Sequence, residues 1–276
     1  MKIIETIHQF KYQCMQSHRP LGLVPTMGNL HEGHMSLIKR AKKDNVIVAV
    51  SIFVNPNQFG PTEDFSTYPR NIKYDLAILK DANVDIVFIP SIEEMYPKGF
   101  DTSIDVGPIA TRLEGEFRPS HFSGVATILC QLISMSRPSN IYLGQKDVQQ
   151  CLVIKKLNDD LNLGTEVVIL PTIRDSDGLA ISSRNIQLTE IQRKAAVVLH
   201  ESLCLAKNLW HDETKNIVHI KLQMRKVIYK QPLANIDYIS IANAGTLEEL
   251  NHKLTPAIVL VAARIGHTRL IDNIIV

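Results

Sequence analysis

The feature that most constrains the fold is an alternation of two kinds of segment in the first part of the chain. Short apolar segments rich in β-branched residues, at 21–25, 46–54 and 84–90, are separated by segments with apolar residues at helical spacing, at 36–44 and 74–82. Strands that are apolar on both faces are typical of parallel sheets covered by helices on both sides. The alternation therefore predicts an α/β fold with a doubly wound, Rossmann-like parallel sheet.

The same pattern continues as far as residue 171. Residues 121–138 are typical of a buried helix that ends at Pro138, and residues 147–161 are typical of a second helix. Each is followed by a short apolar segment, at 141–144 and 165–171. We expect these two segments to be the last strands of the sheet.

After Pro171 the pattern changes, and a polar, turn-rich segment covers 174–185. The rest of the chain predicts helices over 189–210, with Thr189 as the N-cap, and 217–229, followed by strands over 235–243, 257–266 and 268–276. The link between the last two strands is too short for a parallel crossover, so they should pair as a hairpin. We therefore predict two domains, a Rossmann-like domain over 1–172 and a smaller α+β domain over 173–276.

Charge and composition exclude several classes of function. The chain has 30 basic and 28 acidic residues, and a net charge of +2 argues against binding a long polyanion through bulk charge. Residues 1–10 lack the apolar core of a signal peptide, and the longest apolar run, 46–54, is far shorter than the ~20 residues that span a bilayer. We expect a cytoplasmic protein that binds neither nucleic acid nor a membrane.

The cysteines predict neither a disulfide framework nor a zinc site. They are far apart and form no CxxC pair, and we expect buried free thiols at Cys14, Cys130, Cys151 and Cys204. His-Glu-Gly-His at 31–34 has one residue too few for the HExxH zinc motif. A metal bound by its two histidines and a chance pair of loop histidines remain alternatives to the interpretation that follows.

The most informative segment is PTMGNLHEGHMSL, residues 25–37, which joins the first predicted strand to the first predicted helix. Open α/β sheets bind ligands at such junctions, outside the carboxyl ends of the strands. His31 and His34 are three residues apart and share one face of a helical turn, beside the N–H groups of a helix N-terminus. Gly28 and Gly33 allow the backbone to approach a ligand closely. The segment is neither a P-loop nor a GxGxxG motif, and we expect it to bind phosphate.

His-x-Gly-His at this junction resembles the signature of the nucleotidyl-transferring superfamily. Five segments in order, at 25–34, 51–70, 114–129, 144–150 and 174–185, resemble the pantoate–β-alanine ligase family over essentially the whole chain. The resemblance implies a reaction in two steps. Pantoate and ATP would form a pantoyl adenylate and pyrophosphate, and the amine of β-alanine would then release AMP and pantothenate.

The resemblance also implies an ATP-binding set with His34 as the proton-donating catalytic residue. Lys146 follows a strand end and is a compact charge suited to phosphate. The family usually carries Met where this chain has Ile181, and Ile173 matches a position whose backbone contacts adenine. The full set is Met27, Gly28, Asn29, Leu30, His31, Glu32, Gly33, His34, Gly144, Gln145, Lys146, Asp147, Ile173, Ile181, Ser182, Ser183 and Arg184.

Pantoate has hydroxyl groups, and amide side chains read hydroxyls because they both donate and accept hydrogen bonds. Gln58 and Gln150 match the family's pantoate-binding glutamines, and Gln58 would also face β-alanine. Secondary candidates are Asn55, Tyr68, Arg118 and His121, of which the last two are open to a purely structural interpretation as helix-capping residues.

The expected co-substrate is ATP, with Mg²⁺ carried on its phosphates and no metal site in the protein itself. The resemblance also implies a homodimer. Two alternatives stay open: an adenylyltransferase that leaves the nucleotide on its product, and a non-catalytic nucleotide sensor. A tRNA-binding ligase is disfavoured by the low net charge.

Overall fold

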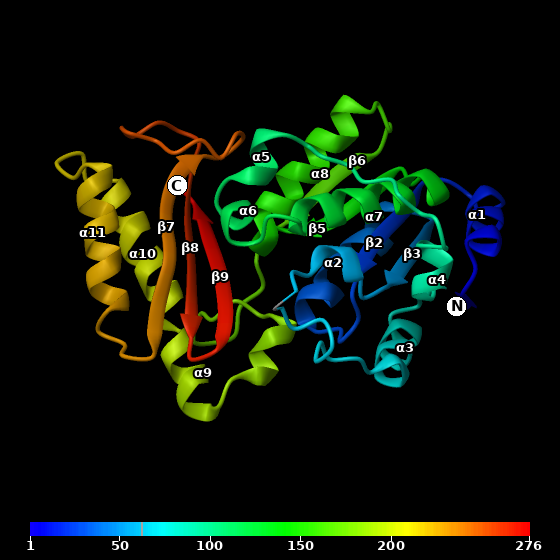
Figure 1. Ribbon diagram of the computed structural model, residues 1–276, viewed down its shortest axis with the longest axis horizontal. Helices are drawn as coiled ribbons and strands as arrows, with labels where there is room; N and C mark the ends of the chain where they lie inside the picture. The colour runs from blue at the N-terminus through cyan, green and yellow to red at the C-terminus, as the bar shows by residue number, and fades with distance from the viewer. Residues whose placement is uncertain (62) are drawn as a thin grey trace. The chain divides into compact units, whose positions relative to one another are not determined.

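The computed structural model describes residues 1–61 and 63–276, and contacts divide this part of the chain into two compact units. The first unit contains Met1–Gly144 and Gln149–Pro171, and the second contains Gln145–Val148 and Thr172–Val276. The short segment 145–148 thus groups with the second unit, although the boundary expected near residue 172 assigns it to the first domain. Figure 1 labels most of the helices and strands of both units.

The described residues of the first unit form a six-stranded parallel sheet in the order β1-β4-β3-β2-β5-β6, which confirms the predicted doubly wound α/β fold. The sequence predicted every strand except β1, a three-residue strand beside β4. Their bounds are β1 Lys2–Ile4, β2 Leu21–Thr26, β3 Ile47–Ile52, β4 Ile86–Phe88, β5 Asn140–Gly144 and β6 Glu166–Leu170.

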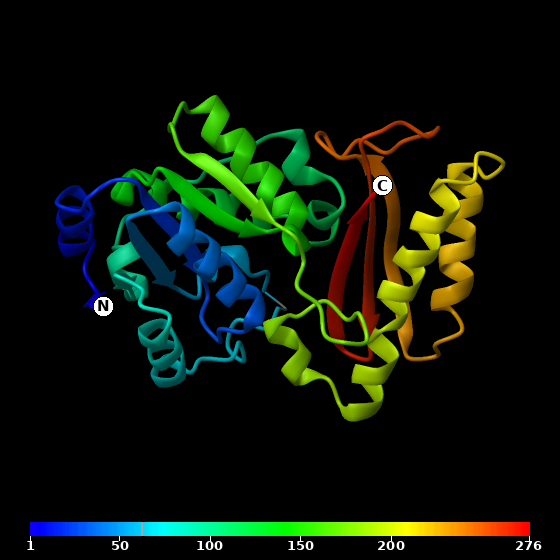
Figure 2. The same ribbon diagram turned by 180° about the vertical axis from the view of Figure 1, so that it is seen from behind.

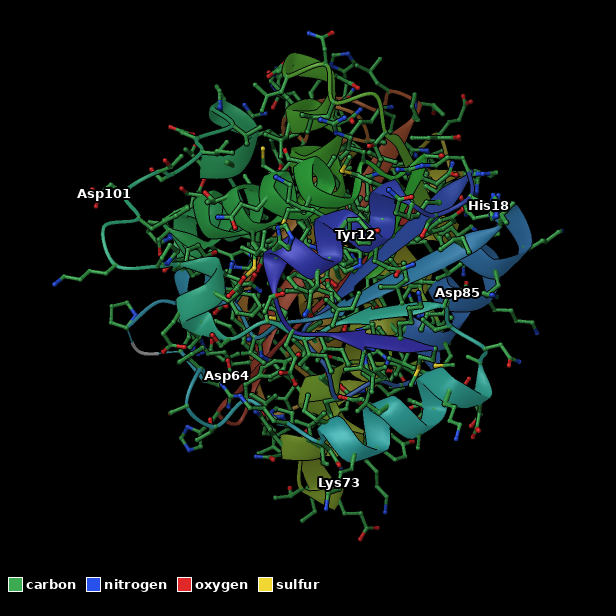
Figure 3. All side chains as sticks on the ribbon, turned by 90° about the vertical axis from the view of Figure 1, so that its right-hand side faces the viewer. Tyr12, His18, Asp64, Lys73, Asp85 and Asp101 are labelled. Carbon is green, nitrogen blue, oxygen red and sulfur yellow. The ribbon has the colours of Figure 1, made fainter. Side chains whose placement is uncertain are left out.

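Helices cover both sides of this sheet. In Figure 3, α1, labelled at Tyr12, and α3, labelled at Lys73, lie on opposite sides of the strands. The sequence did not predict α1, which packs against α7 and stacks Phe10 on Phe88 of β4 with ring centroids 4.2 Å apart. The long helices are α1 Ile7–Met15, α2 Glu32–Asp44, α3 Ile72–Asp81, α7 His121–Ser136 and α8 Val148–Asp160; short ones are α4 Ile92–Met95, α5 Pro108–Thr111 and α6 Glu114–Phe117.

The strand order reverses between β2 and β5. From β2 the sheet continues through β3 and β4 on one side and through β5 and β6 on the other. Leu23 pairs with Ile141, so the two strands end at the same level, at Thr26 and Gly144. Folds of this class bind ligands beyond the carboxyl ends of the strands at such a switch point. The loop that begins at Met27 starts there.

The second unit is a smaller α+β structure, as predicted. Its described residues form a three-stranded antiparallel sheet, β7 Ala234–Asn243, β8 Ala257–Ile265 and β9 Thr268–Ile275, and β8 and β9 form the expected hairpin. Helices α10 Val198–Trp210 and α11 Ile217–Ile228 lie side by side against the sheet (Figure 2). Alternate side chains of β8, from Ala257 to Ile265, belong to the apolar core shared with the helices.

The single helix predicted over 189–210 is wrong in one respect, because two helices occupy it. They are α9 Glu190–Ala196 and α10, separated at Val197. The φ and ψ angles of Val197, −59° and −26°, stay in the right-handed helical region, so the apolar periodicity passes through the junction without a glycine or proline to signal it. Thr189 is the N-cap, as predicted, and forms a capping box with Gln192.

The cysteines are free thiols, as predicted, but burial is complete only for Cys14 and Cys151, and Cys130 and Cys204 are partly exposed. Burial raises the pKa of the Cys14 thiol to about 12, so this group stays protonated and unreactive. Among residues 1–61 and 63–276, no helix is both long and apolar enough to cross a membrane.

Candidate active site

The loop that follows β2 is shaped by one buried carboxylate. Asp75 of α3 is fully buried, and its two oxygens accept the backbone N–H groups of Asn29 at 2.9 Å and Leu30 at 2.8 Å. Gly28 has a φ of +81°, and a Cβ atom there would lie 3.0 Å from Asp75 Oδ2. Glycine is therefore required at residue 28 both for its backbone conformation and for its contact with Asp75. Asp75 was not predicted from the sequence, because an acidic residue on an amphipathic helix gives no signal that it is buried.

His31 and His34 form the N-terminal cap of α2. The backbone N–H of Gly33 donates to His31 Nδ1 at 3.2 Å, and the backbone N–H of His31 donates to His34 Nδ1 at 3.3 Å. Because each Nδ1 accepts a hydrogen bond, the proton of each neutral ring is on Nε2. The ring centroids are 4.1 Å apart. The cap thus orients two imidazole donors together at the start of a helix.

Gly33 explains the spacing of this motif. A Cβ atom at residue 33 would lie 2.9 Å from His31 Cε1, so a larger residue would displace the His31 ring from its capping position. Glu32 is the first residue of α2 and adds an acidic side chain to its first turn, which suits the helix dipole.

The predicted pantoate residues Asn55 and Gln58 lie on the short 3₁₀ helix η1, Pro56–Gln58, and its N-cap, just after β3. Asn55 is buried, and its Nδ2 donates to Gln58 Oε1 at 3.2 Å and to the carbonyl of Gly124 at 3.1 Å. Gln58 Nε2 lies 2.9 Å from Met27 Sδ. The amide of Gln58 is therefore held beside the end of β2, next to the loop that carries the histidines.

Arg118 and His121 contact the backbone of Gln58. Arg118 pairs with Glu63 at 2.6 Å, and its Nη2 also donates to the Gln58 carbonyl at 3.3 Å. Burial, together with the Arg118 charge, lowers the pKa of His121 to about 4, so its ring is neutral at pH 7. His121 Nδ1 donates to the same carbonyl at 2.9 Å, and Nε2 accepts from Arg118 Nη1 at 3.1 Å. Both side chains hold Gln58 in place.

Close packing of α7 also fixes this segment. A Cβ atom at Gly124 would lie 2.2 Å from the Asn57 carbonyl oxygen, so the helix can approach η1 only with glycine there. Tyr68, the other predicted secondary candidate, is buried with its ring edge-on to Phe59 at 5.8 Å.

Gln150 is partly exposed on the first turn of α8, and Gln149 beside it is buried. Gln149 Nε2 donates to the carbonyls of Ile109 at 2.8 Å and Arg112 at 2.7 Å, and its Oε1 accepts from the Glu114 N–H at 3.1 Å. Gln149 thus fixes the segment that leads to Arg118. Gln150 was predicted from the sequence and Gln149 was not, because neighbouring glutamines on one helix give no signal of which is buried.

The end of β5 is divided between the units. Gly144 belongs to the first unit, where its carbonyl accepts from Cys151 Sγ at 3.3 Å. Gln145, Lys146 and Asp147 form the 3₁₀ helix η2 of the second unit. Lys146 pairs with Asp147 at 3.3 Å and is 19% exposed, so its charge is partly shielded from solvent.

The remaining predicted ATP residues lie in the second unit. The backbone N–H of Ile181 donates to the Ile173 carbonyl at 3.0 Å, so the two residues predicted to contact adenine lie side by side. Ser182 caps the 3₁₀ helix η3, Ser183–Gln187, by accepting from the Arg184 N–H at 3.3 Å. Within residues 1–61 and 63–276, no group of three or more His, Cys, Asp or Glu side chains could hold a metal ion.

With this geometry in view, the comparisons with known proteins identify the family. A family model described as pantoate-β-alanine ligase matches residues 2–275. The chain belongs to the pantoate–β-alanine ligase family. A pantothenate synthetase from Roseiflexus castenholzii is 49% identical over 275 residues, covering 100% of this chain and 99% of the relative. One from Thermosipho africanus is 46% identical and covers 100% of both chains.

Solved structures of family members have the same fold. Pantothenate synthetase from Thermus thermophilus matches with a TM-score of 0.95 at 40% identity and 99% coverage of both chains. The ligase from Francisella tularensis, in complex with β-γ ATP and β-alanine, matches with a TM-score of 0.81 at 38% identity, covering 100% of this chain and 97% of that one.

Proposed function

We propose that this chain condenses (R)-pantoate with β-alanine in an ATP-dependent reaction that yields pantothenate, AMP and pyrophosphate. Membership of the family supports the overall reaction. The observation that carries the proposal is the position of the His31–His34 cap beyond the end of β2 at the switch point, on a loop whose first residue, Met27, contacts Gln58. The loop that carries the proposed phosphate donors thus also contacts the amide proposed to bind the pantoate hydroxyls.

In the first step a carboxylate oxygen of pantoate attacks the α-phosphorus of ATP. The new P–O bond forms a pantoyl adenylate as the bond to pyrophosphate breaks, and negative charge builds on the departing phosphates. Preorganised donors stabilise such charge most effectively. His34 Nε2–H and the nearby His31 Nε2–H suit this role, since the cap fixes both tautomers.

In the second step the amine of β-alanine attacks the acyl carbon of the adenylate and expels AMP. Gln58 is proposed to contact both pantoate and β-alanine, and Gln150 pantoate alone. A neutral amide suits this position because it reads the hydroxyls of pantoate without locking the reacting carboxylate into an ion pair. Asn55, Arg118 and His121 act through Gln58, whose amide and carbonyl they hold.

ATP is proposed to contact residues of both units, with the second unit acting as a lid over a hydrolysable intermediate. Lys146 and residues 182–184 would bind phosphate. The Ile181 N–H and Ile173 carbonyl already bond each other, so adenine would use the Ile173 N–H or the Ile181 carbonyl. The flexible thioether of the family's usual Met is not needed for either contact.

Mg²⁺ is proposed to arrive on the phosphates of ATP. The side chains proposed to contact phosphate, those of His31, His34, Lys146 and residues 182–184, are hydrogen-bond donors, which suit phosphate oxygens rather than a cation. We also retain a cytoplasmic location and a homodimer as proposals, and analytical ultracentrifugation tests the latter.

The decisive experiment is mass spectrometry of the products formed from ATP, Mg²⁺, pantoate and β-alanine. We expect AMP, pyrophosphate and pantothenate in equal amounts. ADP in place of AMP would exclude an adenylate. A product that keeps the nucleotide would indicate an adenylyltransferase, and ATP binding without pyrophosphate release would indicate a sensor.

A further inference from the structure

Asn273, in the C-terminal strand β9, binds the segment that carries Lys146. It is 3% exposed, and its Nδ2 donates to the backbone carbonyls of Gln145 at 2.8 Å and Lys146 at 3.0 Å. Its Oδ1 accepts from Gln145 Nε2 at 3.2 Å. One buried amide therefore holds η2 through three hydrogen bonds, across more than a hundred residues of sequence.

The preceding residue of β9 binds a second segment. Asp272 is 4% exposed and accepts both Arg174 Nη1 at 2.6 Å and Arg174 Nη2 at 2.8 Å. Arg174 also donates to the Gly178 carbonyl at 3.0 Å, which closes the turn that leads into residues 181–184. Asp272 Oδ1 further accepts the backbone N–H of Asn273 at 2.8 Å, so the two anchors are themselves connected.

We infer that Asn273 is a positioning residue for Lys146, and that β9 joins Lys146 and residues 181–184 into one body for phosphate binding. The inference rests on the proposed function, because it assigns Lys146 to ATP. It places the lysine with the second unit rather than with the sheet whose strand precedes it in sequence.

The chemistry of the contact favours asparagine over other side chains. Two consecutive carbonyls that face one side chain need two N–H donors on a neutral group. A carboxylate would repel both oxygens, and an aliphatic side chain would leave both carbonyls without this donor. The same three bonds set the backbone orientation of residue 146 and hence the direction from which its side chain leaves η2.

The test is a double-mutant cycle on the full-length enzyme, with the Asn273→Ala, Lys146→Ala and combined variants. We expect Asn273→Ala to lower kcat/KM for ATP by roughly fivefold to 150-fold, the factor that corresponds to 1–3 kcal/mol. The KM for pantoate should stay within about twofold of wild type. If Asn273 acts through Lys146, the combined variant should be no slower than Lys146→Ala alone.

A matched control is Asn140→Ala, which removes an asparagine at the other end of β5 that bonds Glu166 at 3.0 Å on the surface. Its rates should equal those of wild type. Hydrogen exchange should show faster opening of residues 145–148 in Asn273→Ala, with β7 and β8 unchanged. Should that variant fail to fold, Asn273→Ser, which keeps one donor, replaces it in the cycle.

Two results would overturn the inference. One is a combined variant whose loss is the product of the two single losses, because Asn273 would then act independently of Lys146. The other is Asn273→Ala, or its serine replacement, with the wild-type kcat/KM for ATP. In both cases the wild-type enzyme still makes pantothenate, so the proposed function is judged separately.

Discussion

The two loops proposed to bind ATP are held in different ways. In the first unit, residues 27–34 rest on Asp75, which is fully buried and binds two backbone N–H groups. In the second unit, the tip of the 174–184 segment is held at the surface, where Arg193 pairs with Asp175 at 2.7 Å and Asp177 at 2.8 Å. These three side chains are 28–44% exposed.

The difference sets what each loop can do. Salt has little effect on hydrogen bonds between a buried carboxylate and backbone N–H groups. Removing the carboxylate would leave those N–H donors without a hydrogen-bond partner. Exposed ion pairs contribute about 0.2–1 kcal/mol and weaken as salt rises. We therefore interpret the histidine loop as preorganised before substrate binds. In the second loop, only the tip around Asp175 and Asp177 is free to rearrange when nucleotide arrives, because Asp272 fixes its base through Arg174.

The largest expected effect comes from removing one phosphate donor in each unit. His34→Ala and Lys146→Ala should each slow pyrophosphate release by about 10²-fold or more, the scale for one aligned transition-state donor. Stopped-flow measurement of pyrophosphate in single turnovers checks both. His18→Ala and Lys73→Ala, which change exposed residues labelled in Figure 3, are matched controls and should release pyrophosphate at the wild-type rate. Wild-type turnover in either site variant would remove that residue from the mechanism.

The second prediction is a pH dependence of stability that originates in the first unit. His121 has a pKa of about 4 in the folded protein against 6.5 for the free side chain. Above pH 6.5 the ring is neutral in both states, so its contribution to stability is complete. As the pH falls toward 4, the unfolded chain binds a proton that the folded chain does not. The free energy of unfolding should fall by about 2 kcal/mol by pH 5.

Urea unfolding followed by circular dichroism at pH 7 and pH 5 measures this loss. His121→Asn keeps a donor for the Gln58 carbonyl and does not titrate, so the difference between the two pH values should shrink. His200→Asn is the matched variant in the second unit, where partial burial lowers the pKa of His200. It should change the pH dependence of the free energy of unfolding less than His121→Asn does. Equal pH dependence in wild type and His121→Asn would contradict the assignment.

The sequence predicted the framework of the first unit because its strands are apolar on both faces and its loops follow directly from strand ends. It missed β1, whose three residues are too few to show a period. It also placed a continuous helix through Val197, where the backbone angles leave no trace in the residue types.

What the sequence could not supply is the set of partners that hold the candidate site. Asp75 lies 46 residues from Asn29, and Asn273 lies 127 residues from Lys146. Such contacts depend on tertiary packing, and a buried polar residue looks like a surface one when only its neighbours in sequence are known. The candidate ligands could therefore be named from the sequence, whereas their supports required the structure.

The third prediction separates the two half-reactions within the first unit. Gln58→Ala should weaken adenylation and also slow aminolysis of preformed pantoyl adenylate, by about 1–3 kcal/mol in each, or roughly fivefold to 150-fold. Gln150→Ala, from a partly exposed position on α8, should mainly raise the pantoate requirement of the first step. Single-turnover reactions of isolated adenylate distinguish them. Aminolysis at the wild-type rate in Gln58→Ala, over a range of β-alanine concentrations, would leave Gln58 as a pantoate ligand alone.

The smallest effect tests the second loop directly. Arg193→Ala removes both exposed ion pairs, and the loss of up to about 1 kcal/mol should speed hydrogen exchange in residues 175–180 by at most about fivefold. Raising the salt concentration should reproduce this change in wild type and have little effect in the variant, while residues 28–34 exchange alike in all cases. Saturating ATP should protect residues 174–185 in both proteins, because the proposed phosphate contacts replace the lost ion pairs. If ATP left the hydrogen-exchange rates of residues 174–185 unchanged in an active enzyme, this segment would not be a lid. The contrast between the two loops would then concern their stability alone.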